Sequence, residues 1–249
     1  MTAALDLDNL NAMSADALAA RLSGSAADRA ELVRAAAVAG VAEAQAVYGQ
    51  MLLDGRDVPA DPRTAFHWFN KAAKQEHLLA LNMVGRCYEL GWGVPIDMVR
   101  AAECFRVAAE RGLPAAMYNH ATRLTLGEGV AQDRVAALEW FRRAGRGDDA
   151  LMAAKSHNYI GSFHEDGWVV PQDRDAATRH YAQAAEGGDF RGQFNLARML
   201  VEAGDIDTAL HWLARVPESA TPAFIAKARA WIARCNDAHL RDAGAAALA

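Results

Sequence analysis

The sequence predicts an all-α fold, a right-handed superhelical solenoid of about five helix-pair repeats with capping helices at both ends. Columns of identical residues recur along the 249-residue chain at steps of 36, 36 and 40. These columns are Gly55, Gly91, Gly127 and Gly167; Val58, Val94, Val130 and Val170; and Asp61, Asp97, Asp133 and Asp173. Between the columns, apolar residues keep spacings of one, three and four, which is the period of a helix face. This combination predicts a solenoid, because one helix pair cannot bury its apolar face until the next pair stacks on it.

The stretch Ala80–Leu90 represents the first helix of each pair, here named helix A. Its apolar and small side chains fall on one helix face, and they are Ala80, Leu81, Val84, Gly85 and Tyr88. Gly91 follows, and a glycine at this place predicts the end of the helix because it adopts the left-handed conformation freely. Gly85, like Gly49 and Gly161, stands mid-helix, where glycine costs about 1 kcal/mol relative to alanine. These mid-helix glycines therefore predict close helix–helix contacts.

The second helix of each pair, helix B, begins after a loop such as Gly93–Pro95. The carboxylate of Asp97 can accept hydrogen bonds from the first N–H groups of this helix and suits its dipole. The copy Asp61-Pro62 supports this start, since the missing donor of proline costs nothing at the first helical position. Each helix B then carries an alanine, an aromatic residue and a second alanine, namely Ala101/Phe105/Ala108, Ala65/Phe69/Ala72, Ala137/Phe141/Ala144 and Ala177/Tyr181/Ala184. The small residues let the helices approach, and the aromatic side chain fills the gap.

Taken together, the motif A…LG…Y…GxGV…D…A…(W/F)(F/Y)…AA…G resembles the Sel-one-like repeat (SLR) family, relatives of the tetratricopeptide repeats. The resemblance spans residues 30 to 216. The second glycine of GxG, present as Gly93 and Gly129, is replaced by Asp57 and Val169, which leaves the fold intact but makes the loop shape uncertain. The family implies protein or peptide binding on a superhelical scaffold without chemistry of its own. We therefore expect no enzymatic activity and no cofactor.

Residues 1–40 are expected to form N-terminal capping helices and a half repeat. A short helix over Ser14–Leu22 would begin at Ser14 as cap and end at Ser23-Gly24. Ser25–Gly40 then aligns with helix B of the repeats. The array therefore begins in the middle of a repeat.

Five repeats follow, at 41–76, 77–112, 113–147, 148–187 and 188–216. The fourth is longer by four residues, close to one helical turn, so its helix A should gain a first turn that opens at Asp148 or Asp149. The fifth loses the long loop and is similar to the tighter turn of tetratricopeptide repeats. Residues 217–249 should form a C-terminal capping helix with one apolar stripe, which is Phe224, Ile225, Ala228, Trp231, Ile232 and Cys235. The last eight residues, 242–249, are expected to fray.

Composition restricts the partners and the compartment. The formal net charge of -5 and a pI near 5.9 argue against a nucleic-acid or anionic-membrane surface, which needs clustered Lys and Arg. Neither a secretory leader nor a membrane span is apparent, which predicts a cytoplasmic protein. Some secreted SLR relatives carry a disulfide in each repeat, and Cys87 and Cys104 share one repeat here. A bond between them and two buried, reduced thiols both stay open, and the predicted compartment favours the thiols.

The common catalytic motifs are absent from the sequence. No Gly-rich phosphate loop, HExxH motif or nucleophile elbow occurs. The strongest metal-like cluster is His157, His164, Glu165 and Asp166, but its histidines are two helical turns apart, too far to share one ion without other ligands. We therefore expect no metal. The alternatives are a metal-dependent accessory protein or enzyme that uses the His157/His164 region, and a self-associating structural module of unknown oligomeric state.

The binding surface is expected on helix A, which lines the concave groove in the related tetratricopeptide arrays. The predicted groove residues stand three before, one after or four after the small residue in the middle of each helix A. They are Gln50, Asn82, Arg86, Glu89, Tyr118, Thr122, Asn158, Ser162, Glu165, Phe194 and Arg198. Amides can both donate to and accept from a peptide backbone, arginines bind carboxylates, and aromatic rings offer flat apolar contacts. The alternative is that these are ordinary solvated helix residues. The loops at Trp92 and Trp168 are second candidates.

Overall fold

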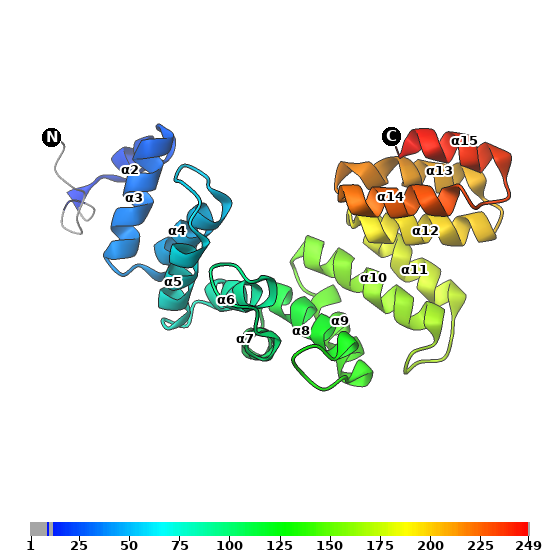
Figure 1. Ribbon diagram of the computed structural model, residues 1–249, viewed down its shortest axis with the longest axis horizontal. Coiled ribbons are helices and arrows are strands. Elements are labelled where there is room, and N and C mark those ends of the chain that lie inside the picture. The colour runs from blue at the N-terminus through cyan, green and yellow to red at the C-terminus, as the bar shows by residue number, and fades with distance from the viewer. Residues whose placement is uncertain (1–8, 10–11, 249) are drawn as a thin grey trace. The chain divides into compact units, whose positions relative to one another are not determined.

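The chain folds into consecutive helix pairs, as the repeat columns predicted (Figure 1). The computed structural model describes residue 9 and residues 12–248, and the other positions of the predicted N-terminal cap and the final residue lie outside the described part. Within that part there are 14 α-helices, one more than the about thirteen that the pattern suggests, and no strand. They form two compact units.

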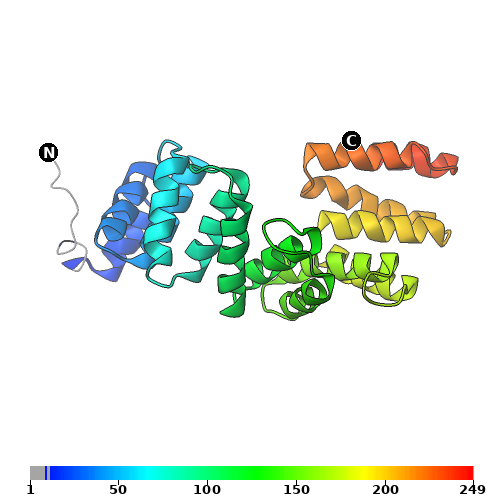
Figure 2. The same ribbon diagram turned by 60° about the horizontal axis from the view of Figure 1, so that its bottom comes forward.

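Unit 1 comprises residues up to Ala116 together with Gly127–Ala131. Its helices are α2 (Ala15–Leu22), α3 (Ala26–Val38), α4 (Ala42–Asp54), α5 (Pro62–Ala73), α6 (Leu78–Leu90) and α7 (Met98–Glu110). Each helix packs against the next along the chain, and Figure 2 shows them standing side by side in chain order. In the repeat alignment, α4 and α6 are A helices, and α3, α5 and α7 are B helices.

Unit 2 comprises Met117–Leu126 and the residues from Gln132 onward. Its elements are most of α8 (Pro114–Leu126), then α9 (Arg134–Gly145), α10 (Ala150–Asp166), α11 (Arg174–Glu186), α12 (Phe190–Glu202), α13 (Ile206–Arg215), a 3₁₀ turn (Val216–Glu218), α14 (Pro222–Ile232) and α15 (Ala238–Ala247). Here too, neighbours in sequence pack together from α9 to α13. Both units therefore have the stacked-pair construction of a solenoid.

The predicted helix boundaries are confirmed by their capping geometry. Each aspartate of the recurring column accepts a hydrogen bond from the backbone N–H three residues later, and these aspartates are Asp61, Asp97, Asp133 and Asp173. The recurring glycines that end the A helices have φ near +70°, and they are Gly55, Gly91, Gly127 and Gly167. The N-terminal caps at Ser14 and Ser25 form as predicted, and Ser25 forms a capping box with Asp28.

The A–B loop keeps a left-handed residue even where its second glycine is replaced. Asp57 and Val169 have φ values of 65° and 50°, compared with 73° for Gly93. Glycine is required at Gly93, because a Cβ there would lie 2.2 Å from the carbonyl oxygen of Pro62. At Asp57 the side chain supplies a different contact, since both carboxylate oxygens accept hydrogen bonds from Arg29 at 2.9 Å. The loop shape thus survives the substitution.

The mid-helix glycines make the close contacts that their positions predicted. A Cβ on Gly85 would lie 2.6 Å from Cε1 of Phe105, and one on Gly161 would lie 2.6 Å from Cε1 of Tyr181. Gly49 stands against Phe69 in the same way, at 2.8 Å. In these three repeats, therefore, the glycine of helix A provides the space that the buried aromatic ring of helix B occupies.

The longer fourth copy and the first C-terminal helix also form as expected. Helix α10 has 17 residues and begins after Asp149, so the extra turn precedes an unchanged buried face. Helix α14 begins after Thr221 and buries Ala228 and Ile232.

The prediction that the tail frays is wrong. Residues 238–247 form α15, which is capped by Asp237 and packs against α13 and α14. Leu240, Gly244 and Leu248 form one buried stripe at spacings of four. The carbonyl oxygen of Leu248 also accepts two hydrogen bonds from Arg229, at 2.6 and 3.0 Å. Small residues allow this close docking, because a Cβ on Gly244 would come within 3.0 Å of Ile232.

Candidate functional site

The predicted groove residues of unit 1 lie together on the face that α4 and α6 form, named here the A-face. Gln50, Asn82 and Arg86 line an open cavity of about 480 Å³, and Leu53, Met83 and Trp92 supply its apolar walls. A smaller cavity of about 240 Å³ shares Gln50, Asn82 and Met83 and continues over Val47 and Leu79. Glu89 lies one turn beyond Arg86 on the same helix. The A-face therefore combines polar side chains with unfilled space.

On the A-face, Gln50 and Arg86 contact acidic residues of their own helices. The amide nitrogen of Gln50 donates to Asp54 at 2.8 Å. The Nε atom of Arg86 lies 3.3 Å from Glu89, and its guanidinium stands 5.5 Å from the ring centroid of Trp92. Asn82 is 7% exposed and forms part of the cavity wall. Trp92, predicted as a contact from its loop, packs partly against the core of unit 1 and keeps one face at the cavity.

In unit 2, the equivalent side chains are bonded to one another. Arg198 on α12 donates to both carboxylate oxygens of Glu165 on α10, at 3.0 and 2.9 Å. The hydroxyl of Tyr181 on α11 donates to the same carboxylate at 2.6 Å and lies 3.2 Å from Ser162. Partial burial by itself would raise the pKa of Glu165, but the hydrogen bonds from Tyr181 and Arg198 outweigh it and lower the pKa below its usual value. This network, here the α10–α12 ladder, joins three consecutive helices.

A hydrogen bond between two asparagines extends the α10–α12 ladder. The amide nitrogen of Asn195 donates to Oδ1 of Asn158 at 2.9 Å, and Arg198 also donates to Asn195 at 3.3 Å. Asn158 is buried. The predicted amide Asn158 and the predicted Arg198 are thus linked through Asn195, across consecutive A helices.

The predicted aromatic contacts are largely interior. Phe194 is 6% exposed and packs edge-on against Phe224 and Trp231 in the C-terminal core. It is a core side chain and offers no flat exposed surface. The ring of Tyr118 packs edge-on against Phe141 and Tyr159, and burial raises the pKa of its hydroxyl. Thr122 donates back to the carbonyl oxygen of Tyr118 at 2.9 Å.

Three histidines of unit 2 form a column that the sequence pattern only partly indicated. His180 on α11 stacks on His157, with 5.2 Å between ring centroids, and on His164, with 5.6 Å. The Nδ1 atoms of His157 and His180 are 3.1 Å apart. Burial lowers the pKa of His157, and it lowers the pKa of His180 to about 4, with further repulsion from the other two rings. His180 was missed because it stands in a repeat column that holds Trp68 and Trp140 in other copies.

The stacked arrangement of the three histidine rings differs from that of ligands around one metal ion. Near-parallel imidazole rings present their faces to each other, whereas ligands of one ion direct in-plane lone pairs to a common point. Among residues 9 and 12–248, no group of three or more His, Cys, Asp or Glu side chains is arranged to hold a metal ion. In the same residues, no helix has the length and apolarity needed to cross a membrane.

The cysteines are free thiols in the structure. Burial raises the pKa of Cys87 to about 12 and that of Cys104 to about 11. Protonated thiols of this kind behave as small apolar side chains.

The stacked helix pairs define the molecule as an α-solenoid repeat protein. The Sel1 repeat model matches four segments, residues 42–77, 78–113, 114–149 and 154–189, and the chain belongs to the Sel1 repeat family. The four residues left between the third and fourth segments, 150–153, coincide with the added turn of α10. Members of this family generally serve as scaffolds for protein–protein interaction and are typically non-catalytic.

Solved structures of two proteins resemble this chain in fold. A Sel1 repeat protein from Oxalobacter formigenes is 24% identical with a TM-score of 0.75, over 90% of this chain and 94% of that one. The protective antigen c5321 of uropathogenic Escherichia coli is 21% identical with a TM-score of 0.54, over 98% and 64%. At these identities the likeness concerns the fold alone. Protein SHC1 of Saccharomyces cerevisiae is 31% identical over 111 residues, which is 45% of this chain and 21% of that protein, so the match spans about a fifth of its length.

Proposed function

We propose that this protein is a non-catalytic interaction scaffold, and that the A-face of unit 1 binds an extended segment of a partner protein. The observation that supports the proposal is the cavity in which Gln50, Asn82, Arg86 and Trp92 meet. Family membership supports the scaffold role in general, and the cavity supports this particular face.

The chemistry of the A-face suits a peptide better than an apolar ligand. Leu53, Met83 and Trp92 can cover an apolar side chain, while the amides that line the cavity can bond a peptide backbone in both directions. Gln50 uses its amide nitrogen toward Asp54, so its carbonyl oxygen is available to accept from a peptide N–H. Arg86 can exchange its long contact with Glu89 for a carboxylate of the partner.

The predicted groove residues of unit 2 enter the proposal differently. Ser162, Glu165 and Arg198 are half-buried and hold the α10–α12 ladder, so we propose that they hold the scaffold in shape and contact a partner through their remaining surface only. Tyr118, Thr122, Asn158 and Phe194 stay predicted groove residues whose burial leaves little area for a partner.

The test uses a photo-crosslinking amino acid introduced into the full chain in its native host. Placed at Gln50, it should capture a distinct protein that mass spectrometry identifies. The matched control position is Lys71, which is exposed on α5 and lies outside the A-face cavities. The captured protein is then purified and its affinity for Asn82→Ala and Arg86→Ala variants is measured by calorimetry. Capture from both positions alike, or unchanged affinity of both variants, would refute the proposal.

A further inference from the structure

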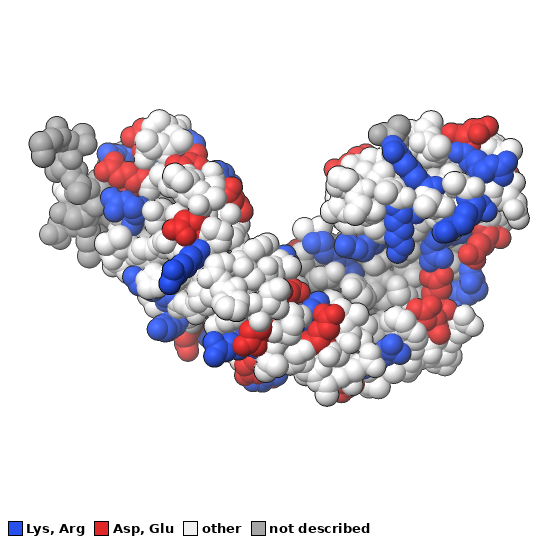
Figure 3. Space-filling view, in the orientation of Figure 1, with Lys and Arg blue, Asp and Glu red and all other residues white. Residues whose placement is uncertain are grey.

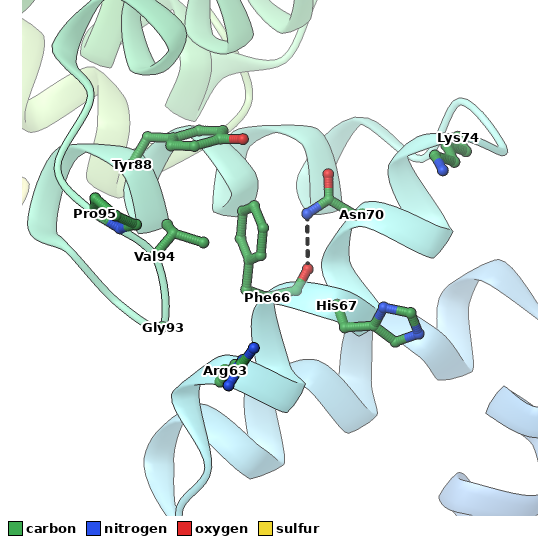
Figure 4. A pocket seen from close by; sticks show the side chains of 9 residues that line it. All are labelled: Arg63, Phe66, His67, Asn70, Lys74, Tyr88, Gly93, Val94 and Pro95. Atoms are coloured by element: carbon green, nitrogen blue, oxygen red, sulfur yellow. Dashed lines mark hydrogen bonds between the residues drawn. The ribbon is translucent and has the colours of Figure 1, made fainter.

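A second and larger cavity of unit 1 lies away from the A-face. It has a volume of about 760 Å³ and is formed by α5, by Tyr88 near the end of α6, and by the loop Gly93–Pro95. Figure 4 shows Phe66, Tyr88 and Val94 around its centre, with Arg63, His67 and Lys74 around them. None of its lining residues lines either cavity of the A-face.

The cavity continues toward α7. An adjoining cavity of about 450 Å³ shares Asn70, Lys74 and Tyr88 with it and extends to Arg100. Together they form what we name the B-furrow, which runs between the second helices α5 and α7 over residues of α6. Its floor is aromatic and rigid, because Phe66 packs edge-on against Tyr88 at 5.3 Å and the Tyr88 hydroxyl accepts a hydrogen bond from Arg100 at 3.1 Å. A volume in the range of about 300–1,000 Å³ is typical of ligand-binding clefts.

The rim of the B-furrow is basic. Arg63 and Lys74 are exposed, and neither makes an ion pair in the part of the chain that the structure describes. Arg100 is also exposed and shares its charge with Asp97 at 3.3 Å. The acidic residue of the lining is Glu103, whose two carboxylate oxygens accept hydrogen bonds from Arg106. Among the residues that line the two cavities, three are therefore cations and one is a carboxylate, which pairs with Arg106.

This charge distribution differs from its surroundings. The whole chain has a formal net charge of -5. In the view of Figure 3, acidic and basic side chains are interspersed over unit 1. A local excess of basic groups beside half-buried aromatic rings attracts acidic partners.

We propose that the B-furrow binds an acidic segment of a partner protein in which Asp or Glu residues flank an aromatic or large aliphatic residue. The apolar residue of the partner covers Phe66, Tyr88 and Val94, and the flanking carboxylates pair with Arg63, Lys74 and Arg100. Asn70 lines both cavities, and although its amide nitrogen donates to the carbonyl oxygen of Phe66 at 2.9 Å, its side-chain oxygen can accept from the peptide backbone. This site goes beyond the proposed function of the A-face, because it uses another surface and can bind at the same time.

The test measures fluorescence anisotropy of a labelled ten-residue peptide with Asp and Glu on both sides of a central Phe, titrated with the full chain. A matched peptide carries Asn and Gln at the acidic positions. We expect the acidic peptide to bind at least about tenfold more tightly, and its affinity to fall as salt is raised. Equal binding of the two peptides, or no binding of the acidic one, overturns the proposal.

Charge-reversal variants test whether the acidic peptide binds in the B-furrow. Arg63→Glu together with Lys74→Glu should weaken the acidic peptide at least about tenfold, whereas Lys71→Glu, a single charge reversal on the same helix outside the furrow, should leave it within about twofold. Arg86→Ala should have no effect, which separates this site from the A-face. Circular dichroism melts of all variants check that the fold is intact. A loss with Lys71→Glu equal to that with the double variant overturns the site.

Two other occupants give distinct outcomes. If inorganic phosphate at low millimolar concentration displaces the peptide, the furrow is an anion site without selectivity for a protein segment. If light scattering shows a dimer that dissociates in the Arg63→Glu/Lys74→Glu variant while no peptide binds, the occupant is a second copy of this chain. Either result overturns the proposal.

Discussion

The A helices of unit 1 and unit 2 carry polar side chains at matching repeat positions, yet the two units use them differently. In unit 1, Arg86 and Gln50 border open cavities and contact acidic residues of their own helices, and Arg86 also stands over Trp92 in the following loop. In unit 2, Arg198 and Glu165 bond to each other across two repeats, and Tyr181 closes the network from the B helix between them. The comparison teaches that one column can border an open cavity or supply internal cohesion, depending on whether the next repeat supplies the complementary group.

The hydrogen-bonding partners explain the difference. A carboxylate that accepts from both an arginine and a tyrosine is largely satisfied, and disrupting such a half-buried network costs more than disrupting an exposed pair. Arg86, by contrast, is more than a third exposed along its side chain and pairs with a residue on its own helix. Such a group can change partners at little cost in stability, which is what a binding surface needs.

The largest expected effect tests what the two units have in common. Gly85→Leu in unit 1 and Gly161→Leu in unit 2 should each lower the free energy of unfolding by about 3 kcal/mol, because the new side chain would overlap a buried ring. Urea denaturation followed by circular dichroism measures it. Gly145→Ala serves as a control, since its added Cβ would meet only atoms at 3.6 Å or more. A Gly85→Leu protein as stable as the parent would show that Phe105 can move aside.

The next effect separates the units. Glu165→Ala and Arg198→Ala should each destabilise unit 2 by about 1–3 kcal/mol, because the α10–α12 ladder loses its central acceptor or its donor. Arg86→Ala in unit 1 should cost less than about 0.5 kcal/mol. Hydrogen exchange with mass spectrometry reports the two units separately. Equal protection losses in the Arg86→Ala and Arg198→Ala proteins would remove the distinction between them.

A pH titration tests the contribution of the histidine column to the stability of unit 2. Burial lowers the pKa of His157 and of His180, the latter to about 4, whereas the unfolded rings titrate near 6.5. The unfolded chain therefore binds more protons in this window, so the stability contribution is complete above about pH 6.5 and falls as the pH drops toward 4. Because the rings are only half-buried, we expect a loss of roughly 1–2 kcal/mol.

The control for this titration is a histidine variant. His180→Asn should flatten the decline between pH 6.5 and 4, measured as the urea midpoint of unit 2, while His211→Asn at an exposed position should not. An identical decline in the parent and in His180→Asn would assign it to other groups. Raising the pH back to 7 should restore the parent midpoint.

The smallest expected effect concerns binding. Once a partner of the A-face is known, Asn82→Ala should weaken it by about 1 kcal/mol with little change in melting temperature. Asn158→Ala, its equivalent in unit 2, should instead lower the melting temperature, because Asn195 loses its acceptor. Isothermal calorimetry measures the affinity of both variants, and thermal melts measure their melting temperatures. The reverse result, stability lost at Asn82 and affinity lost at Asn158, would exchange the roles of the two units.

The sequence by itself determined the architecture of this protein. Helix ends follow from local chemistry, since an aspartate that accepts from N–H groups three residues away and a glycine in the left-handed conformation need no distant partner. The close contact of Gly85 with Phe105 could also be predicted, because the glycine recurs as Gly49 and Gly161 and only stacking explains a glycine in the middle of a helix. The added turn of α10 followed in the same way from its length.

Only the tertiary structure decided what the polar columns do. Glu165 and Arg198 are 33 residues apart, and whether they meet depends on how α12 packs over α10 and on the rotamers of two long side chains. The stacking of His180 on two histidines of another helix also depends on helix packing. The burial of the α15 leucines likewise needs the surface that α13 and α14 form. Capping depends on residues a few positions apart in one segment of the chain. The polar surfaces are formed by side chains from separate helices, so helix packing decides which side chains become neighbours.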